Sequence, residues 1–131
     1  MHRFLLILLL ATCGLAQAEA PRQIADTYAV AQGDGFKAST TRGSEFFVRK
    51  FGVSDKMPSC STCHTTNPAN TGQHVITGKS IKPLAPAANP NGLSDSAKVE
   101  KWFTRNCKEV TGRACTPGEK ADFIAYLMEA H

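Results

Sequence analysis

The sequence of 131 residues predicts one small all-α domain. Four segments carry apolar residues at helical spacing, and no segment shows the strict alternation that is typical of β-strands. Five of the seven prolines lie between residues 53 and 93, where no long helix or strand fits. Because only 8% of the residues are aromatic, such a domain has a thin core and needs a cofactor or a covalent link to complete it.

The first segment is typical of a secretory signal peptide. A short positive start (residues 1–3) precedes the apolar run FLLILLL (residues 4–10), and Ala-Gln-Ala (residues 16–18) forms a small-x-small exit. A membrane span would need about 20 apolar residues, roughly twice the length of this run. We therefore expect a signal peptide at 1–18, export to the periplasm and a mature domain at 19–131. An uncleaved helix and lipidation at Cys13 are the alternatives.

The charge of the mature chain is only mildly basic. Residues 19–131 carry 14 basic and 11 acidic residues, a formal charge of +3, and no basic run is longer than Arg49-Lys50. Such scattered charges indicate a solvated surface, so we expect neither nucleic-acid binding nor a membrane span in the mature chain. Four cysteines remain in an oxidising compartment.

The first two helices are predicted from their spacing and their ends. Apolar positions predict a helix over 21–31, which the Gly-Asp-Gly at 33–35 ends. A second amphipathic helix is expected over 39–51, before Gly52.

Two further helices follow the proline-rich stretch. Val99, Trp102, Phe103 and Asn106 share one face of a helix expected over 95–106. Thr116-Pro117-Gly118-Glu119 is a capping box with proline at the first helical position, so a last helix is predicted to run to about Glu129.

The motif Cys60-Ser61-Thr62-Cys63-His64 is CxxCH, the signature of covalent c-type haem attachment. Two thiols three residues apart can bind the two vinyl groups of one porphyrin, and the adjacent His64 then ligates the iron. A thioredoxin-like dithiol fits less well, since no buried strand precedes the motif. Zinc is also less suitable, because a remote fourth ligand would leave one cysteine of Cys107 and Cys115 unpaired.

The remaining mature cysteines, Cys107 and Cys115, are predicted to form a disulfide. Haem attachment uses the other pair, and the seven residues between these two include Gly112, which permits a turn.

The expected arrangement resembles class I cytochromes c, small helical domains around one covalently attached haem. Their end helices cross closely, which Gly43 and Phe47 against Phe123 and Tyr126 would allow here. The sequence resembles more specifically the sphaeroides haem protein family of oxygen-binding cytochromes c. This resemblance spans residues 39–128 and rests on several blocks in order: PSCSTCH (58–64), TGKSIKPLAP (77–86), DSAKVEKW (95–102), RNC (105–107), GR (112–113) and CTPGEKAD (115–122).

Candidates for the second axial ligand of the iron are few. Met57 lies on the attachment side, Met128 falls in the last helix among packing residues, and His74 lies in a Gly-rich loop. Asn106 continues the apolar face of its helix, and its alternative role is that of a helix C-cap. The family resemblance implies that Asn106 is a labile axial ligand. An amide oxygen is a hard, weak donor, so reduction of the iron should release it.

His64 is expected to coordinate iron through one ring nitrogen and to donate the other N–H to a carbonyl. The segment 81–86 is the candidate for that carbonyl.

The sequence therefore predicts a periplasmic c-type cytochrome with one haem c. We expect it to exchange electrons with a redox partner protein, expected to be another cytochrome, and to bind O₂ or NO reversibly. No catalytic residues are assigned, and no enzyme activity is expected. A plain six-coordinate electron carrier and a non-haem thiol or zinc protein are the alternatives.

Overall fold

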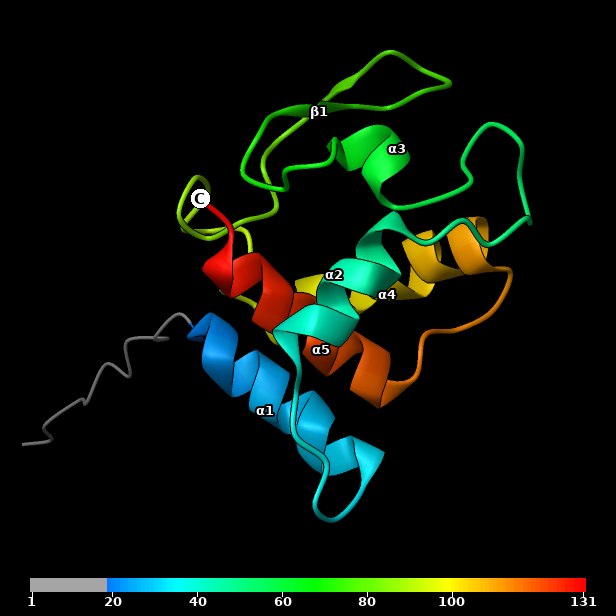
Figure 1. Cartoon of the computed structure of the whole chain (residues 1–131). Coiled ribbons are helices and arrows are strands. Elements are labelled where there is room, and N and C mark those ends of the chain that lie inside the picture. The colour runs from blue at the N-terminus through cyan, green and yellow to red at the C-terminus, as the bar shows by residue number, and fades with distance from the viewer. Residues whose placement is uncertain (1–18) are drawn as a thin grey trace, which may run out of the picture.

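The structure is a computed structural model that describes residues 19–131 (Figure 1). The predicted signal peptide and Cys13 lie outside the described residues. The elements follow in the order α1 (Pro21–Gln32), α2 (Thr40–Val48), α3 (Ser61–His64), β1 (Gly72–Gln73), β2 (Ser80–Ile81), α4 (Ser96–Thr111) and α5 (Pro117–Glu129). The all-α fold class is confirmed, and the two strands form only a minor hairpin.

The first two helices lie close to their predicted positions. Pro21 opens α1, and Gly33, with a φ of 127°, ends it. Ser39 caps α2 by accepting a hydrogen bond from the Arg42 backbone N–H. This helix ends at Val48 rather than at 51, because Arg49 adopts an extended conformation with a ψ of 132°.

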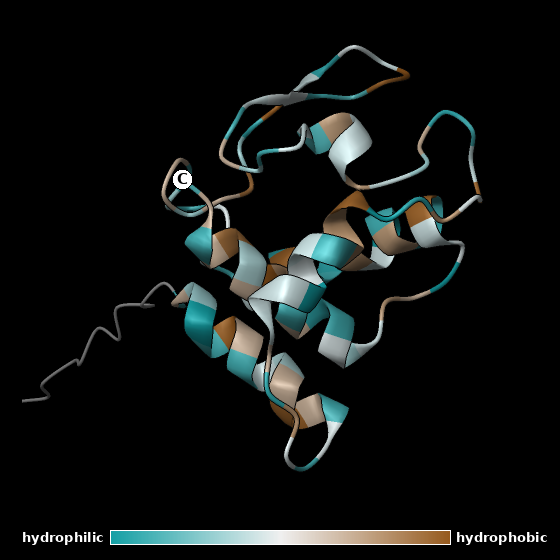
Figure 2. Ribbon diagram, viewed as in Figure 1, coloured by the Kyte–Doolittle hydropathy of each residue, from teal (hydrophilic) through white to brown (hydrophobic). Residues whose placement is uncertain are grey.

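The proline-rich stretch holds no long element, as predicted, but it does contain a hairpin that periodicity missed. Its antiparallel strands pair Gly72 with Ile81 and Gln73 with Ser80. Strands of two residues are too short to show alternation in a sequence. The turn between them exposes Val75 and Ile76, at 44% and 57%, and the tip of this loop is hydrophobic in Figure 2.

Helix α4 is longer than the 95–106 segment that its sequence predicts. It runs to Thr111, and Gly112 ends it in the left-handed conformation with a φ of 74°. The capping box of α5 is present as predicted, with Thr116 Oγ1 accepting from the Glu119 N–H and the Glu119 carboxylate accepting from the Thr116 N–H.

The core forms where α5 crosses α1 and α2. Gly43 of α2 lies so close to α5 that an added Cβ would stand 2.0 Å from the Asp122 carbonyl oxygen. Phe47 then contacts Phe123 and Tyr126, with ring centroids 5.9 and 5.5 Å apart. The predicted crossing of Gly43 and Phe47 with the last helix is therefore confirmed.

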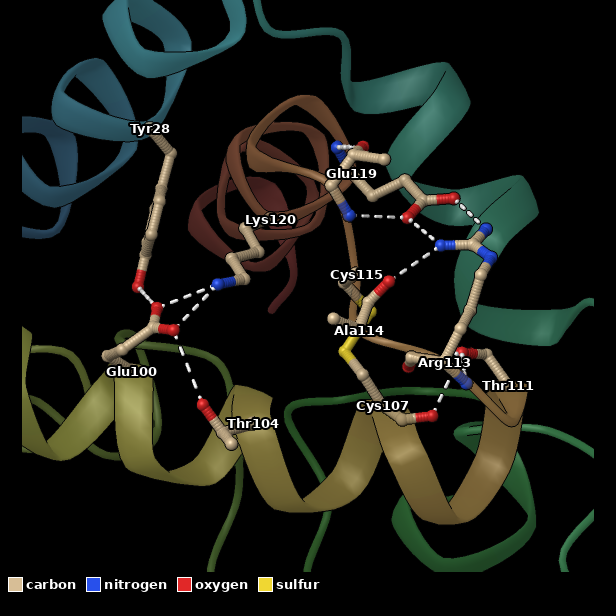
Figure 3. The surroundings of a disulfide bond; sticks show 11 residues. Tyr28, Glu100, Thr104, Cys107, Thr111, Arg113, Ala114, Cys115, Glu119 and Lys120 are labelled. Atoms are coloured by element: carbon tan, nitrogen blue, oxygen red, sulfur yellow. Dashed lines mark hydrogen bonds and ion pairs between the residues drawn. A yellow bond between two sulfur atoms is a disulfide. The ribbon is translucent and has the colours of Figure 1, made fainter.

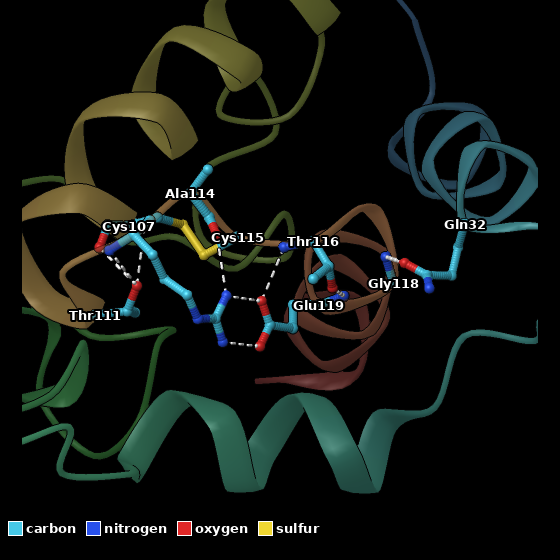
Figure 4. Close-up of polar contacts among 9 residues, drawn as sticks. Gln32, Cys107, Thr111, Ala114, Cys115, Thr116, Gly118 and Glu119 are labelled. Atoms are coloured by element: carbon cyan, nitrogen blue, oxygen red, sulfur yellow. Dashed lines mark hydrogen bonds and ion pairs between the residues drawn. A yellow bond between two sulfur atoms is a disulfide. The ribbon is translucent and has the colours of Figure 1, made fainter.

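Helix α1 covers another side of α5. The Gly118 backbone N–H donates to Gln32 Oε1 over 2.7 Å (Figure 4). Within residues 19–131, none of the helices has the length and apolar character needed to span a membrane.

Candidate functional site

The CxxCH motif forms one short helical turn, α3. The backbone N–H groups of Cys63 and His64 both donate to the Cys60 carbonyl, over 3.3 and 3.2 Å. Ser59 Oγ lies 3.0 Å from Thr62 Oγ1 and steadies the start of this turn. The turn thus gathers two thiols and an imidazole within five residues, which is the spacing that haem attachment requires.

Thr65 ends α3 directly after the candidate iron ligand. Its φ of 62° is unusual for a β-branched residue. The Thr65 hydroxyl offsets this strain by donating to the Asn67 carbonyl over 2.7 Å and accepting from the Asn67 N–H over 3.2 Å. Backbone strain of this kind is concentrated at functional sites.

The chemistry of these side chains suits a covalently held haem. Cys60 and Cys63 are free thiols, and Cys60 packs against the hydrophobic core to which α4 contributes Val99. Burial raises the pKa of the Cys60 thiol to about 11. Burial also lowers the pKa of His64, which favours the neutral imidazole that coordinates iron.

A zinc site receives no matching support. Among the described residues, no three His, Cys, Asp or Glu side chains are gathered in a way that could hold a metal ion, the CxxCH residues included. A haem needs fewer ligands from the protein, because the porphyrin itself supplies four of the iron ligands. Two thiols and one imidazole on α3 therefore fit the haem better than they fit zinc.

The segment proposed to orient His64 is held in a different way. The backbone N–H groups of Leu84 and Ala85 donate to the carbonyl of Pro68, over 2.9 and 3.0 Å. No hydrogen bond joins the His64 ring to 81–86 or to any other part of 19–131, and burial alone shifts its pKa. The segment thus packs on the loop that follows α3, and the carbonyl that orients His64 stays a prediction.

Asn106 lies inside α4, five residues before the end of the helix. Gly112 is the C-cap, so the alternative that Asn106 caps the helix is wrong. Its side chain is half-buried and makes no hydrogen bond with the described residues, and its amide atoms remain accessible. The amide is therefore free to bind another group.

Two of the other three candidate ligands have structural roles. Met128 packs against the hydrophobic core. His74 Nδ1 accepts from the backbone N–H groups of Ile76 and Thr77, both over 3.3 Å, and so shapes the hairpin turn. Met57 is half-buried three residues before Cys60.

The helix that carries Asn106 is fixed on both sides of this residue (Figure 3). On its C-terminal side, Cys107 and Cys115 form a disulfide with a Cα–Cα distance of 5.7 Å. This is the pair of cysteines that the sequence predicts to form a disulfide. On its N-terminal side, the Glu100 carboxylate accepts from Lys120 Nζ and from the Tyr28 hydroxyl, over 2.8 and 2.6 Å.

The Tyr28–Glu100–Lys120 cluster joins α1, α4 and α5, and sequence reasoning missed it. Its members are 72 and 20 residues apart, and no local pattern relates them. Although partial burial raises the pKa of Glu100, hydrogen bonds from Lys120 and Tyr28 outweigh this and hold the pKa below its ordinary value. The cluster and the disulfide together set the position of the Asn106 segment.

Comparisons with known proteins agree with this fold. Residues 33–127 match the family described as a domain of unknown function, DUF1924. The chain is 46% identical over 129 residues to cytochrome c-type protein SHP of Cereibacter sphaeroides, covering 97% of this chain and 98% of that protein. It is 50% identical over 91 residues to cytochrome c'' of Methylophilus methylotrophus, covering 69% of this chain but only 63% of that protein.

A solved structure supports the same assignment. The structure of oxidised SHP, described as an oxygen-binding cytochrome c, matches with a TM-score of 0.77 and 46% identity, over 84% of this chain and 96% of that one. Sequence identity of this size across nearly the full length shows that the two proteins share a fold and a common origin. The chain therefore belongs to the sphaeroides haem protein family of c-type cytochromes, whose cofactor is covalently attached haem c.

Proposed function

We propose that this protein is a periplasmic monohaem cytochrome that exchanges electrons and binds a diatomic ligand at a weakly ligated iron. Cys60 and Cys63 hold the haem through thioether bonds, and His64 is the permanent iron ligand. Asn106 is the labile second ligand. A haem iron exchanges one electron and binds O₂, NO or CO when one axial position is free.

One observation carries the proposal: the unpartnered amide of Asn106 in the interior of α4. The half-buried Asn106 side chain makes no hydrogen bond with the described residues and its amide is accessible, so it is available to ligate the iron. The Asn106 carboxamide oxygen is a hard donor, so it binds ferric iron better than ferrous iron. Release of the amide on reduction would open the site to a diatomic ligand.

The related SHP, described as an oxygen-binding cytochrome c, supports ligand binding by this chain as well. The motif typical of a signal peptide supports a periplasmic location. The relatives are c-type cytochromes, so electron exchange and ligand binding are the proposed roles.

The main alternative is a six-coordinate electron carrier with Met128 or His74 as the second ligand. Core packing of Met128 and the engaged Nδ1 of His74 both favour Asn106 over this alternative. The two functions predict different ferrous spectra, high-spin and CO-reactive for the proposed function and low-spin for the carrier.

The test is the absorption spectrum of Asn106→Ala in both oxidation states. The ferric iron should become five-coordinate or water-bound, and covalent haem should be retained. Ferrous protein should bind CO equally in wild type and variant, because reduction has already released the amide.

Asn70→Ala is the matched control, since Asn70 is exposed and lies in the loop after α3. It should leave the ferric spectrum unchanged. An unchanged ferric spectrum in Asn106→Ala, with a wild-type ferrous form that does not bind CO, would establish the plain electron carrier instead.

A further inference from the structure

Helix α4, which carries Asn106, is attached to the other helices mainly by side chains. Helix α5 packs closely along both α1 and α2, whereas the backbone of α4 lies close to no other helix over a comparable stretch of 19–131. Only two residues of α4 are buried, Val99 and Cys107, and the second belongs to the disulfide. The position of α4 therefore depends on a small number of individual contacts.

One of these contacts is an ion pair between Glu100 of α4 and Lys120 of α5. Both carboxylate oxygens of Glu100 accept from Lys120 Nζ, each over 2.8 Å. Of the four ion pairs within residues 19–131, this is the one that connects α4 to another element, since Arg105 and Glu109 pair within α4 itself. An ion pair between two helices resists their relative movement, which a pair within one helix does not.

Lys120 has few other partners within reach. Its side chain is only 12% exposed, and its ammonium lies 5.1 Å from the ring centroid of Tyr28 and 5.8 Å from that of Phe103. An unpaired charge in such a place is costly, so an ammonium that lost its carboxylate would move toward water. Loss of Glu100 would thus displace Lys120 and loosen the aromatic contacts around it.

The Glu100 carboxylate is fixed by further donors. The Tyr28 hydroxyl donates to it over 2.6 Å, and the Thr104 hydroxyl donates over 3.3 Å (Figure 3). Because Tyr28 belongs to α1 and Lys120 to α5, one carboxylate joins three helices. Donors that share one acceptor in this way hold each other in place.

Phe103 connects this cluster to Asn106. The Phe103 ring packs edge to face against Tyr28 and Phe123, with ring centroids 5.8 and 5.7 Å apart. Phe103 and Asn106 are three residues apart on α4, so they lie on the same side of the helix. A shift or rotation of α4 that displaced Phe103 would therefore displace Asn106 as well.

We propose that Glu100 and Lys120 are positioning residues that hold Asn106 where its amide binds ferric iron, and that they thereby set how easily a ligand from solution displaces it. The inference rests on the proposed function, in which Asn106 is the labile iron ligand, and adds what controls its lability. A weak donor is sensitive to small displacements, because little free energy separates its bound and free states.

The test measures the dissociation constant of imidazole for the ferric, haem-loaded protein at about pH 8, where imidazole is largely uncharged. Imidazole must displace Asn106 in order to bind, so a weaker bond between Asn106 and the iron raises its apparent affinity. Glu100→Gln should raise that affinity at least about fivefold and should shift the ferric absorption spectrum toward that of Asn106→Ala.

Lys120→Met breaks the same ion pair with the opposite change in net charge. Because Glu100→Gln removes a negative charge and Lys120→Met a positive one, an electrostatic effect on the iron would have opposite signs in the two variants. Loss of the link between the helices predicts a higher imidazole affinity in both. Changes of opposite sign would overturn the proposal.

The Asn106→Ala background decides whether the effect passes through Asn106. In that background imidazole has no amide to displace, so adding Glu100→Gln should change the affinity by less than about twofold. An equal effect of Glu100→Gln with and without Asn106 would also overturn the proposal.

Glu109→Gln is the matched control, because Glu109 pairs with Arg105 inside α4 and joins no other helix of 19–131. It removes the same charge nearer to Asn106 in the sequence and should change the imidazole affinity by less than about twofold. Amide hydrogen exchange in α4 should be faster in Glu100→Gln and unchanged in Glu109→Gln. If Glu100→Gln does not fold, Tyr28→Phe, which removes one donor to Glu100, should raise the affinity to a smaller extent.

The outcomes separate this inference from the proposed function. If Asn106→Ala changes the ferric spectrum while Glu100→Gln and Lys120→Met alter neither the spectrum nor the imidazole affinity, the proposed function stands and the positioning role is overturned. If Asn106→Ala leaves the ferric spectrum unchanged, the proposed function fails, and this inference fails with it.

Discussion

The two halves of the molecule are built on different principles. Helices α1, α2 and α5 bury a continuous core in which Phe47 and Ile124 are fully covered. The stretch from 49 to 95, which bears the CxxCH motif, has one short helix and a hairpin of two-residue strands, and most of its side chains are half-buried or exposed. Stability is thus concentrated in the helix crossing, and the chemistry in the stretch that packs least.

Substitutions at two buried glycines can measure how tightly each of the two regions packs. An added Cβ at Gly43 would meet the Asp122 carbonyl oxygen at 2.0 Å, and one at Gly72 would meet the Cys63 carbonyl oxygen at 2.2 Å. The collisions are nearly equal, but the first lies between two helices and the second between a hairpin and a single helical turn. How far each neighbour can shift decides the cost.

The largest effect is expected for Gly43→Ala. Because the aromatic contacts of Phe47 fix α2 against α5, neither helix can retreat from the new methyl group. We expect a loss of at least about 3 kcal/mol in the free energy of unfolding, measured by urea denaturation. Ser44→Ala, one residue along the same helix, is the control and should change stability little. A loss below about 1 kcal/mol at Gly43 would show that the crossing is loose.

The next effect concerns the disulfide, which joins the end of α4 to the start of α5. Replacing Cys107 and Cys115 together by serine should lower the free energy of unfolding by about 2 to 3 kcal/mol in the chain-entropy account of a short closed loop. Urea denaturation of the haem-loaded double variant is the measurement, with wild type under the same oxidising conditions as its reference. An unchanged midpoint would mean that the other contacts of α4 suffice to hold it.

A smaller loss of stability is expected for Gly72→Ala, on the order of 1 to 2 kcal/mol, because the hairpin can move away from α3. Its displacement should instead disturb the haem site, since Gly72 lies against the backbone of the attachment turn. We expect a change in the ferric absorption spectrum, which Gly43→Ala at comparable folded fraction should not produce. If the two variants lost equal stability with no change in spectrum, the distinction between the halves would fail.

The smallest effect concerns the ion pair of Arg113 and Glu119, which Figure 3 shows beside the disulfide. A hydrogen bond from Arg113 is the main cause that lowers the pKa of Glu119. The stabilisation is therefore complete above the ordinary carboxyl pKa of about 4.5 and is lost as the pH falls through the lower value of the folded state.

Glu119→Gln should remove this dependence on pH. The half-exposed Arg113 is screened by solvent, so the difference from wild type at pH 6 should be only about 0.5 kcal/mol and should shrink in 1 M salt. Urea denaturation between pH 3 and pH 6 is the measurement. A difference that stays constant across this range would exclude the charge of Glu119 as its source.

Local patterns in the sequence specified the parts of the fold that depend on near neighbours. The capping box at Thr116, the spacing of Gly43 and Phe47, and the CxxCH turn each involve residues within a few positions, and helical periodicity makes such relations visible. The C-terminal end of α4 was harder to predict, because residues 107–111 lack a clear apolar repeat. The helix continues through them until Gly112 permits a left-handed turn.

Only the tertiary structure decided the rest. The Tyr28–Glu100–Lys120 cluster joins three helices that are remote in sequence, and it exists because α1 and α4 both pack beside α5. The structure also decided against one role of Asn106, although through the local extension of α4 to Gly112. In the sequence its amide could be a helix cap, whereas the extra turn of α4 removes that role and leaves a half-buried donor without a partner. Contacts between distant segments depend on how helices pack, and no local pattern encodes them.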